Sequence, residues 1–106
     1  MTETFPAAGP DRRRSERVPL REAVTLCWQE DGQERREHTF TISISRFGCA
    51  VVNGAHLRPG TAVTLLHNGN STHGSVVYNL KDSTRDFIEV GIAFPAAGEQ
   101  FWEHCF

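Results

Sequence analysis

Residues 41–52 read Thr-Ile-Ser-Ile-Ser-Arg-Phe-Gly-Cys-Ala-Val-Val, an apolar run that is interrupted by a short polar turn and then resumes. This pattern predicts two strands joined by a tight turn. Gly48 stands where a positive φ, or the close approach of a bulky neighbour, costs least. Ser45, three residues earlier, offers a hydroxyl to a backbone amide or to a ligand. The turn can therefore be a simple connection or also a contact surface.

Alternating apolar residues predict further strands on both sides of this turn. The six predicted strands cover residues 18–28, 40–44, 48–52, 62–66, 74–80 and 87–94. Turn dipeptides such as Asp31-Gly32 separate them. No alternation of strands with helices is visible, which argues against a parallel nucleotide-binding sheet. We therefore expect an all-β fold, a six-stranded antiparallel β-barrel, because closure removes exposed strand edges.

The two ends of the chain differ from this pattern. Residues 1–11 are rich in Pro, Ala and Gly and have no apolar period, so they are predicted to be a flexible leader before a single domain at residues 12–106. Apolar residues recur at helical spacing within residues 96–106, which predicts a short C-terminal helix that covers an open end of the sheet. Gly91, inside the last predicted strand, suggests a bulge or a close contact.

The cations are unevenly distributed, although the formal net charge is only −2. Seven of the eleven lie before residue 37, and four lie within residues 12–17. Ten are arginines, whose planar guanidinium can pair bidentately with phosphate or a guanine edge. The cluster is suited to nucleotide-like anions. The alternative is a solvated, disordered tail.

The remaining polar residues do not indicate catalysis. The three cysteines include no Cys-x-x-Cys pair, and no signal peptide or membrane-length apolar run is present, so a reducing cytoplasm is the expected location. Cys27 and Cys49 lie in apolar runs, as buried free cysteines usually do. The five histidines have no metal-ligand spacing and are interpreted as surface or strand residues. We expect neither enzyme activity nor a metal or cofactor.

Residues 13–20, Arg-Arg-Ser-Glu-Arg-Val-Pro-Leu, and residues 43–48, Ser-Ile-Ser-Arg-Phe-Gly, resemble the two motifs of the PilZ domain family in their order along the chain. That family has an Arg-x-x-x-Arg segment before the first barrel strand and an Asp/Asn-x-Ser-x-x-Gly turn between the second and third strands. Residues 90–94, Val-Gly-Ile-Ala-Phe, resemble the family's last strand. The similarity therefore covers most of the chain.

The resemblance implies a receptor module for cyclic di-GMP, a bacterial second messenger, which converts ligand binding into an altered surface for a downstream protein partner. The ligand-binding residues that it implies are Arg12, Arg13, Arg17, Ser43, Ser45 and Gly48. Arg13 and Arg17 match the two motif arginines, and Arg12 resembles members that bind a stacked pair of ligands. Ser43 departs from the family's Asp or Asn, and its shorter side chain weakens or removes one guanine contact.

Two other functions are compatible with the sequence. A degenerate PilZ-like module would bind no nucleotide and act through protein contacts, which Ser43 favours. A small barrel that binds single-stranded nucleic acid would need exposed aromatic residues beside the basic cluster. The aromatic residues here fall mostly on alternating positions expected to face inward, and the net charge is slightly negative. Binding of a nucleic-acid polymer is therefore not expected.

Overall fold

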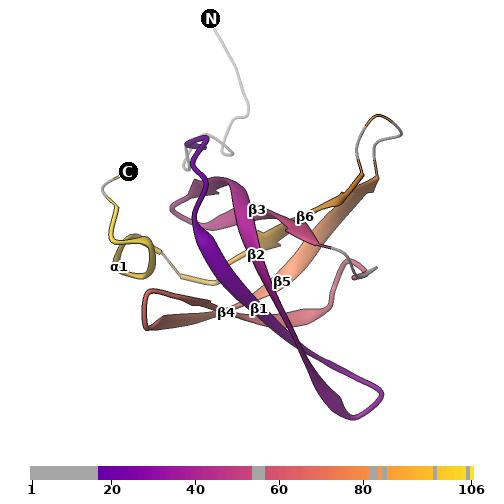
Figure 1. Ribbon diagram of the computed structural model, residues 1–106. Helices are drawn as coiled ribbons and strands as arrows, with labels where there is room; N and C mark the ends of the chain where they lie inside the picture. Colours follow the sequence, from indigo (N-terminus) through magenta and orange to yellow (C-terminus); the bar gives the residue numbers. More distant parts are fainter. Residues whose placement is uncertain (1–16, 54–56, 82–83, 85, 97, 105) are drawn as a thin grey trace, which may run out of the picture.

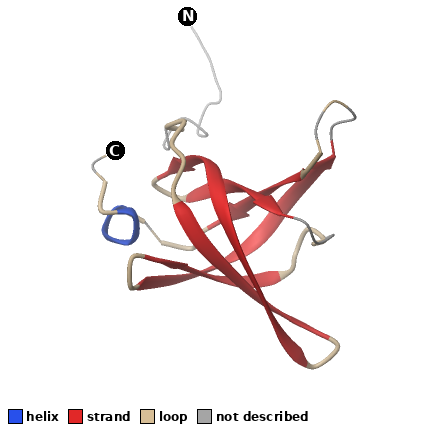
Figure 2. Cartoon of the chain, in the orientation of Figure 1, coloured by secondary structure: helices blue, strands red, loops and turns tan. Residues whose placement is uncertain are grey.

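The computed structural model describes residues 17–53, 57–81, 84, 86–96, 98–104 and 106. Its strands form a closed antiparallel barrel with the order β1-β2-β3-β6-β5-β4 (Figures 1 and 2). The elements are β1 (Ala23–Glu30), β2 (Gln33–Ser45), β3 (Gly48–Asn53), β4 (Ala62–His67), β5 (Asn70–Lys81), β6 (Ile88–Ala93) and α1 (Glu99–Trp102). The predicted six-stranded barrel is confirmed. None of the described helices has the length and apolar character needed to cross a membrane.

Two tight hairpin turns have the backbone conformation that their sequences predict. Asp31 and Gly32 between β1 and β2 both have positive φ, at 54° and 77°. Asn68 and Gly69 between β4 and β5 do the same, at 50° and 81°. Positive φ at both central residues is the type I′ geometry, whose twist matches that of the flanking strands. The turns therefore set the register of both hairpins.

The first strand is shorter than the sequence pattern suggests. It begins at Ala23, and residues 18–22, called the strap below, run beside β2 without continuing the β1 ladder. Val18 makes an isolated bridge to Ile44. Further along the strap, the Thr41 hydroxyl donates to the Leu20 carbonyl at 2.6 Å and accepts from the Glu22 amide at 2.8 Å. These side-chain bonds replace the ladder that the alternation predicts, so the strap is a separate segment.

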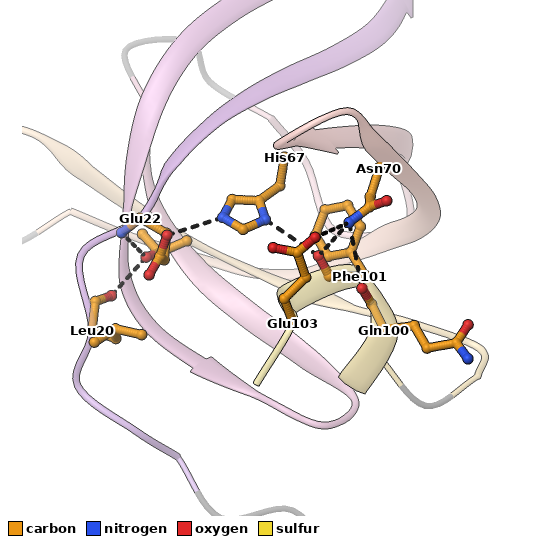
Figure 3. A network of polar contacts seen from close by, with 8 residues as sticks. Leu20, Glu22, His67, Asn70, Gln100, Phe101 and Glu103 are labelled. Carbon is orange, nitrogen blue, oxygen red and sulfur yellow. Dashed lines mark hydrogen bonds and ion pairs between the residues drawn. The ribbon is translucent and has the colours of Figure 1, made fainter. Parts of the chain in front are cut away.

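His67 anchors the strap from the other side, as Figure 3 shows. One ring nitrogen lies 2.9 Å from a Glu22 carboxylate oxygen, and the other lies 3.2 Å from the Phe101 carbonyl of α1. The ring is only 3% exposed. His67 is thus a strand histidine, the last residue of β4, and it is buried between the strap and α1 rather than on the surface.

The core lies inside the barrel and extends to the end that α1 covers. The fully buried core side chains come from all six strands and include Leu26, Ile44, Val51, Leu65, Val76 and Val90. Phe101 and Trp102 of α1 are buried in the same cluster, in edge-to-face contact with centroids 4.7 Å apart. Figure 1 shows α1 beside the end of the barrel. The predicted role of the C-terminal segment is confirmed, with a helix of only one turn.

Candidate functional site

The outer face of four neighbouring strands, β2, β3, β6 and β5, carries small side chains. The strand registers place two rows across these strands. One row is Ser43, Ala50, Gly91 and Tyr78, and the next is Ser45, Gly48, Ala93 and Ser75. The alternate positions Ile44, Cys49, Ile92 and Val76 belong to the core. Because side chains alternate between the faces of a sheet, the two rows lie outside. We call them the floor.

A bulge lies beside each end of the first row. The β2 register shifts between Thr41 and Ser43, and the β5 register shifts between Val76 and Tyr78. Such irregularities redirect the side chains that follow them, and they are enriched beside functional sites. Here they bring Ser43 and Tyr78 into one row, and they leave Val77 53% exposed at the edge of the floor.

A pocket of about 150 Å³ lies over this floor. Its lining includes Arg17, Ser43, Ser45, Gly48 and Tyr78. The bridge between Val18 and Ile44 brings Arg17 to the pocket, because Arg17 precedes Val18 and Ile44 lies between Ser43 and Ser45. The described part of the site therefore combines a cation, two hydroxyls and a closely approachable backbone.

Gly48 is required by close packing. Its φ is not among the positive values, so the left-handed alternative does not apply. A Cβ at this position would overlap the backbone carbonyl oxygen of Ile92 in β6. Ser45 donates its hydroxyl to the Gly48 carbonyl at 3.3 Å, rather than accepting from an amide. Both features hold the turn close against β6.

The same turn is held on its other side by the C-terminal segment. The Phe94 amide donates to the Phe47 carbonyl at 2.9 Å, and the Gly98 amide donates to the Arg46 carbonyl at 2.6 Å. The Arg46 guanidinium in turn donates to the Phe106 carbonyl at 3.2 Å. The turn that lines the pocket is thus in direct contact with the C-terminal segment that carries α1.

Tyr78 is the one large side chain on the floor. Its ring covers Gly91, because a Cβ on this glycine would overlap the ring. Its hydroxyl donates to Glu89 at 2.7 Å, and the Arg17 side chain lies close enough to favour the phenolate. Burial, followed by the bond to Glu89, raises the pKa of Tyr78, and Arg17 opposes this rise. The close contact predicted at Gly91 is confirmed, and the bulge lies in the opposite strand.

Cys49 is buried next to the site, on the inner side of β3. Burial raises the pKa of its thiol far above the usual value, although the nearby Arg17 charge acts in the other direction. A protonated buried thiol is a poor nucleophile. Cys49 therefore serves as a core residue, as its apolar context predicts.

The structure brings together four of the six residues implied by the PilZ resemblance, namely Arg17, Ser43, Ser45 and Gly48. Arg12 and Arg13 lie outside the described residues, as does the predicted leader at residues 1–11. Tyr78 and Glu89 were not anticipated. The only signal for them was Gly91, whose missing side chain leaves room for a ring on the neighbouring strand. Within the described part of the chain, no group of three or more His, Cys, Asp or Glu residues could hold a metal.

Comparison with known proteins shows the fold and no more. No family model matches the chain, and no curated protein matches it. Among solved structures it is similar to the Bacillus subtilis inhibitor of motility MotI/DgrA, with a TM-score of 0.68 and 16% sequence identity. The alignment covers 89% of this chain and 47% of that protein. This chain therefore corresponds to about half the length of its structural neighbour.

Proposed function

We propose that this protein is a cytoplasmic receptor module that binds cyclic di-GMP and passes the bound state to a protein partner. The observation that carries the proposal is the Val18–Ile44 bridge, which holds Arg17 over a pocket lined by Ser43, Ser45 and Gly48. The last residue of the first sequence motif, Arg17, thus meets the second motif, about thirty residues further along the chain, at one place on the barrel. Such a meeting is what a divided binding motif requires.

The chemistry of this place suits a cyclic dinucleotide. The ligand is doubly anionic, and its guanines offer O6 and N7 as acceptors, which an arginine can bond bidentately. The small floor lets a purine ring approach the backbone. The pocket of about 150 Å³ is smaller than a typical small-molecule site of roughly 300–1,000 Å³. It therefore suits one base, with the rest of the ligand left for contacts with Arg12 and Arg13.

Transmission to a partner has a physical route. The pocket-lining turn contacts the C-terminal segment through Arg46 and Phe47, and the strap contacts α1 through Glu22 and His67. A ligand that binds Arg17 and the turn therefore contacts both the strap and the turn, and both of these segments are linked to the region of α1. We propose that the partner binds the surface around the strap and α1 and recognises its change on ligand binding.

The second candidate is a PilZ-like module that binds no nucleotide and acts through protein contacts. Ser43 favours it, because this residue is 9% exposed in the pocket and is shorter than the Asp or Asn of the family. Calorimetric titration of the purified protein with cyclic di-GMP separates the two. Saturable binding that requires Arg17 supports the receptor. No heat of binding at millimolar ligand supports the interaction module.

A further inference from the structure

His67 is buried where the strap, β4 and α1 meet (Figure 3). Its Nε2 lies 2.9 Å from a carboxylate oxygen of Glu22, and its Nδ1 lies 3.2 Å from the carbonyl oxygen of Phe101. Both ring nitrogens thus face oxygen atoms that accept hydrogen bonds. A neutral imidazole has one N–H, whereas the imidazolium has two. The doubly protonated ring is therefore the form that can donate to both oxygens at once.

Water has little access to this ring. The His67 side chain is 2% exposed, and the rings of Phe101 and Trp102 pack against it with centroids 5.6 and 5.2 Å away. In a neutral ring, the lone pair of one nitrogen faces the lone pairs of an oxygen, and the two atoms are too close for a water molecule to lie between them. The number of protons on His67 therefore decides whether one bond or two join the ring to its neighbours.

The charged and titratable groups around His67, within the described residues, come from the strap, β2 and the end of α1. Glu22 of the strap contacts the ring directly, and Glu103, which follows α1, belongs to the same polar network. His38 of β2 lines the same outer hollow, and Arg21 of the strap stacks on an exposed phenylalanine. The negative charge of Glu22 favours the doubly protonated ring, and burial opposes it. A change in the proton count of His67 therefore acts most strongly on its bond to Glu22.

Glu22 connects this ring to the pocket over the floor. Its backbone exchanges hydrogen bonds with Thr41, whose amide donates to the Glu22 carbonyl at 2.9 Å and whose hydroxyl accepts from the Glu22 amide at 2.8 Å. At the other end of the strap, Val18 pairs with Ile44 and places Arg17 at the pocket. The strap therefore has one end at the pocket and the other end at His67.

We propose that His67 is a pH-dependent latch between the strap and α1. The doubly protonated ring donates to Glu22 and to the Phe101 carbonyl, and so joins the two segments. A ring that loses one proton keeps a weaker bond to Glu22, without charge on the donor. It releases the Phe101 carbonyl, which still accepts from the Asn70 amide at 3.3 Å. His67 is thus a positioning residue for Arg17, and only its effect on the ligand rests on the proposed function.

The latch has a defined sign with pH. Histidine changes its charge between about pH 5 and 8. The folded state alone brings both acceptors to the ring, so the contribution of the latch is present at the acidic end of this range and is lost as the pH rises. The Thr41 amide reports on the strap, because it is bonded to the Glu22 carbonyl. We expect its protection factor to fall about fivefold across the range, the value of one hydrogen bond.

The experiment follows the ring and the strap of the ligand-free protein by NMR from about pH 5 to 8. The nitrogen chemical shifts of the His67 ring count its protons, and hydrogen exchange, corrected for the intrinsic effect of pH, gives the protection of the Thr41 amide. His67→Gln offers an amide donor to Glu22 at every pH, so the protection should lose its pH dependence. His73→Gln is the matched control, because His73 is exposed on β5 and is bonded to Thr64. It should behave as the wild-type protein does.

Glu22→Gln tests the charge interaction. It keeps the size of the side chain and removes the negative charge, so His67 should lose its second proton at a lower pH than in the wild-type protein. Calorimetric titration with cyclic di-GMP at both ends of the pH range tests the consequence for the site. The wild-type protein and His73→Gln should bind more tightly at the acidic end, and His67→Gln should bind equally at both.

The other outcomes overturn specific statements. A constant number of protons on His67, or a Thr41 protection factor that does not change with pH, excludes the latch and leaves the proposed function standing. A pH dependence that persists in His67→Gln excludes it as well. Wild-type binding that is equal at both ends of the range excludes the positioning of Arg17 by His67. A working latch in a protein that does not bind cyclic di-GMP overturns the proposed function instead. Thermal unfolding verifies that each variant is folded, and the titration of the wild-type ring needs no variant.

Discussion

Val18 and Ile44 exchange two backbone hydrogen bonds, from the Val18 amide to the Ile44 carbonyl at 2.8 Å and from the Ile44 amide to the Val18 carbonyl at 2.9 Å. The bridge is outside the regular barrel ladder. It places the arginine that precedes Val18 beside the turn that follows Ile44. The geometry of the site therefore depends on how the strap pairs with β2.

Arg17→Ala should weaken cyclic di-GMP binding by about 1.5–3 kcal/mol, the value of a hydrogen bond to a charged group. We expect a loss of the same size for Arg13→Ala, since that residue matches the other motif arginine. Arg58→Ala is the control, because it removes an equal charge from an exposed position between β3 and β4. Titration at fixed salt gives all three values. An equal loss in the control would mean that only the overall charge matters.

Thr41→Val should loosen the strap. The hydroxyl makes two bonds to the strap and is nearly fully buried, so its removal leaves the Leu20 carbonyl and the Glu22 amide without this partner. We expect the free energy of unfolding to fall by about 1–3 kcal/mol, and the Val18 amide to exchange faster. Urea unfolding and amide hydrogen exchange measure the two effects. Unaltered exchange at Val18 would show that its bridge to Ile44 holds the strap unaided.

Gly48→Ala and Gly91→Ala should differ, although both glycines are on the floor. At Gly48 the added methyl meets the backbone of β6, which cannot move aside, and we expect a loss of about 2 kcal/mol or more. At Gly91 it meets the Tyr78 ring, which can rotate away. The stability loss should then be smaller, about 1 kcal/mol, but the ring should leave the floor. Unfolding curves and the fluorescence of Tyr78 report on each, and equal destabilisation would contradict the distinction.

The ionisation of Tyr78 should occur above the usual value for tyrosine, because burial and Glu89 both disfavour the phenolate. The chain has a single tyrosine, so absorbance during an alkaline titration reports on this group alone. Glu89→Gln should lower the pKa of Tyr78, and Arg17→Ala should raise it. The pKa of Tyr78 is higher in the folded state than in the unfolded state. The contribution of Tyr78 to the free energy of unfolding is therefore fully present below about pH 10 and is lost as the pH rises above it. A pKa of Tyr78 that is insensitive to both substitutions would exclude the interactions of its hydroxyl with Glu89 and Arg17.

The faces of the strands and the geometry of two hairpin turns can be predicted from the sequence alone. Alternation with a period of two assigns each residue to one face of a strand, and Asp-Gly and Asn-Gly turns set the register of two hairpins. The motif residues Ser43, Ser45 and Gly48 lie within one hairpin, so their proximity needed no knowledge of the rest of the chain. The predictions for Arg12 and Arg13 stay predictions, since both lie outside the described residues.

The part of the site that β5 and β6 contribute depends on tertiary structure and could not be predicted from the sequence. The pairing of β3 with β6 joins strands that no hairpin connects, and periodicity carries no information about which residue of a distant strand lies opposite. That pairing puts Gly91 next to Ala50, and the β5 bulge then brings Tyr78 over Gly91. The contacts of His67 with Glu22 and with Phe101 of α1 likewise depend on the closed barrel, because these partners are 45 and 34 residues away in the sequence.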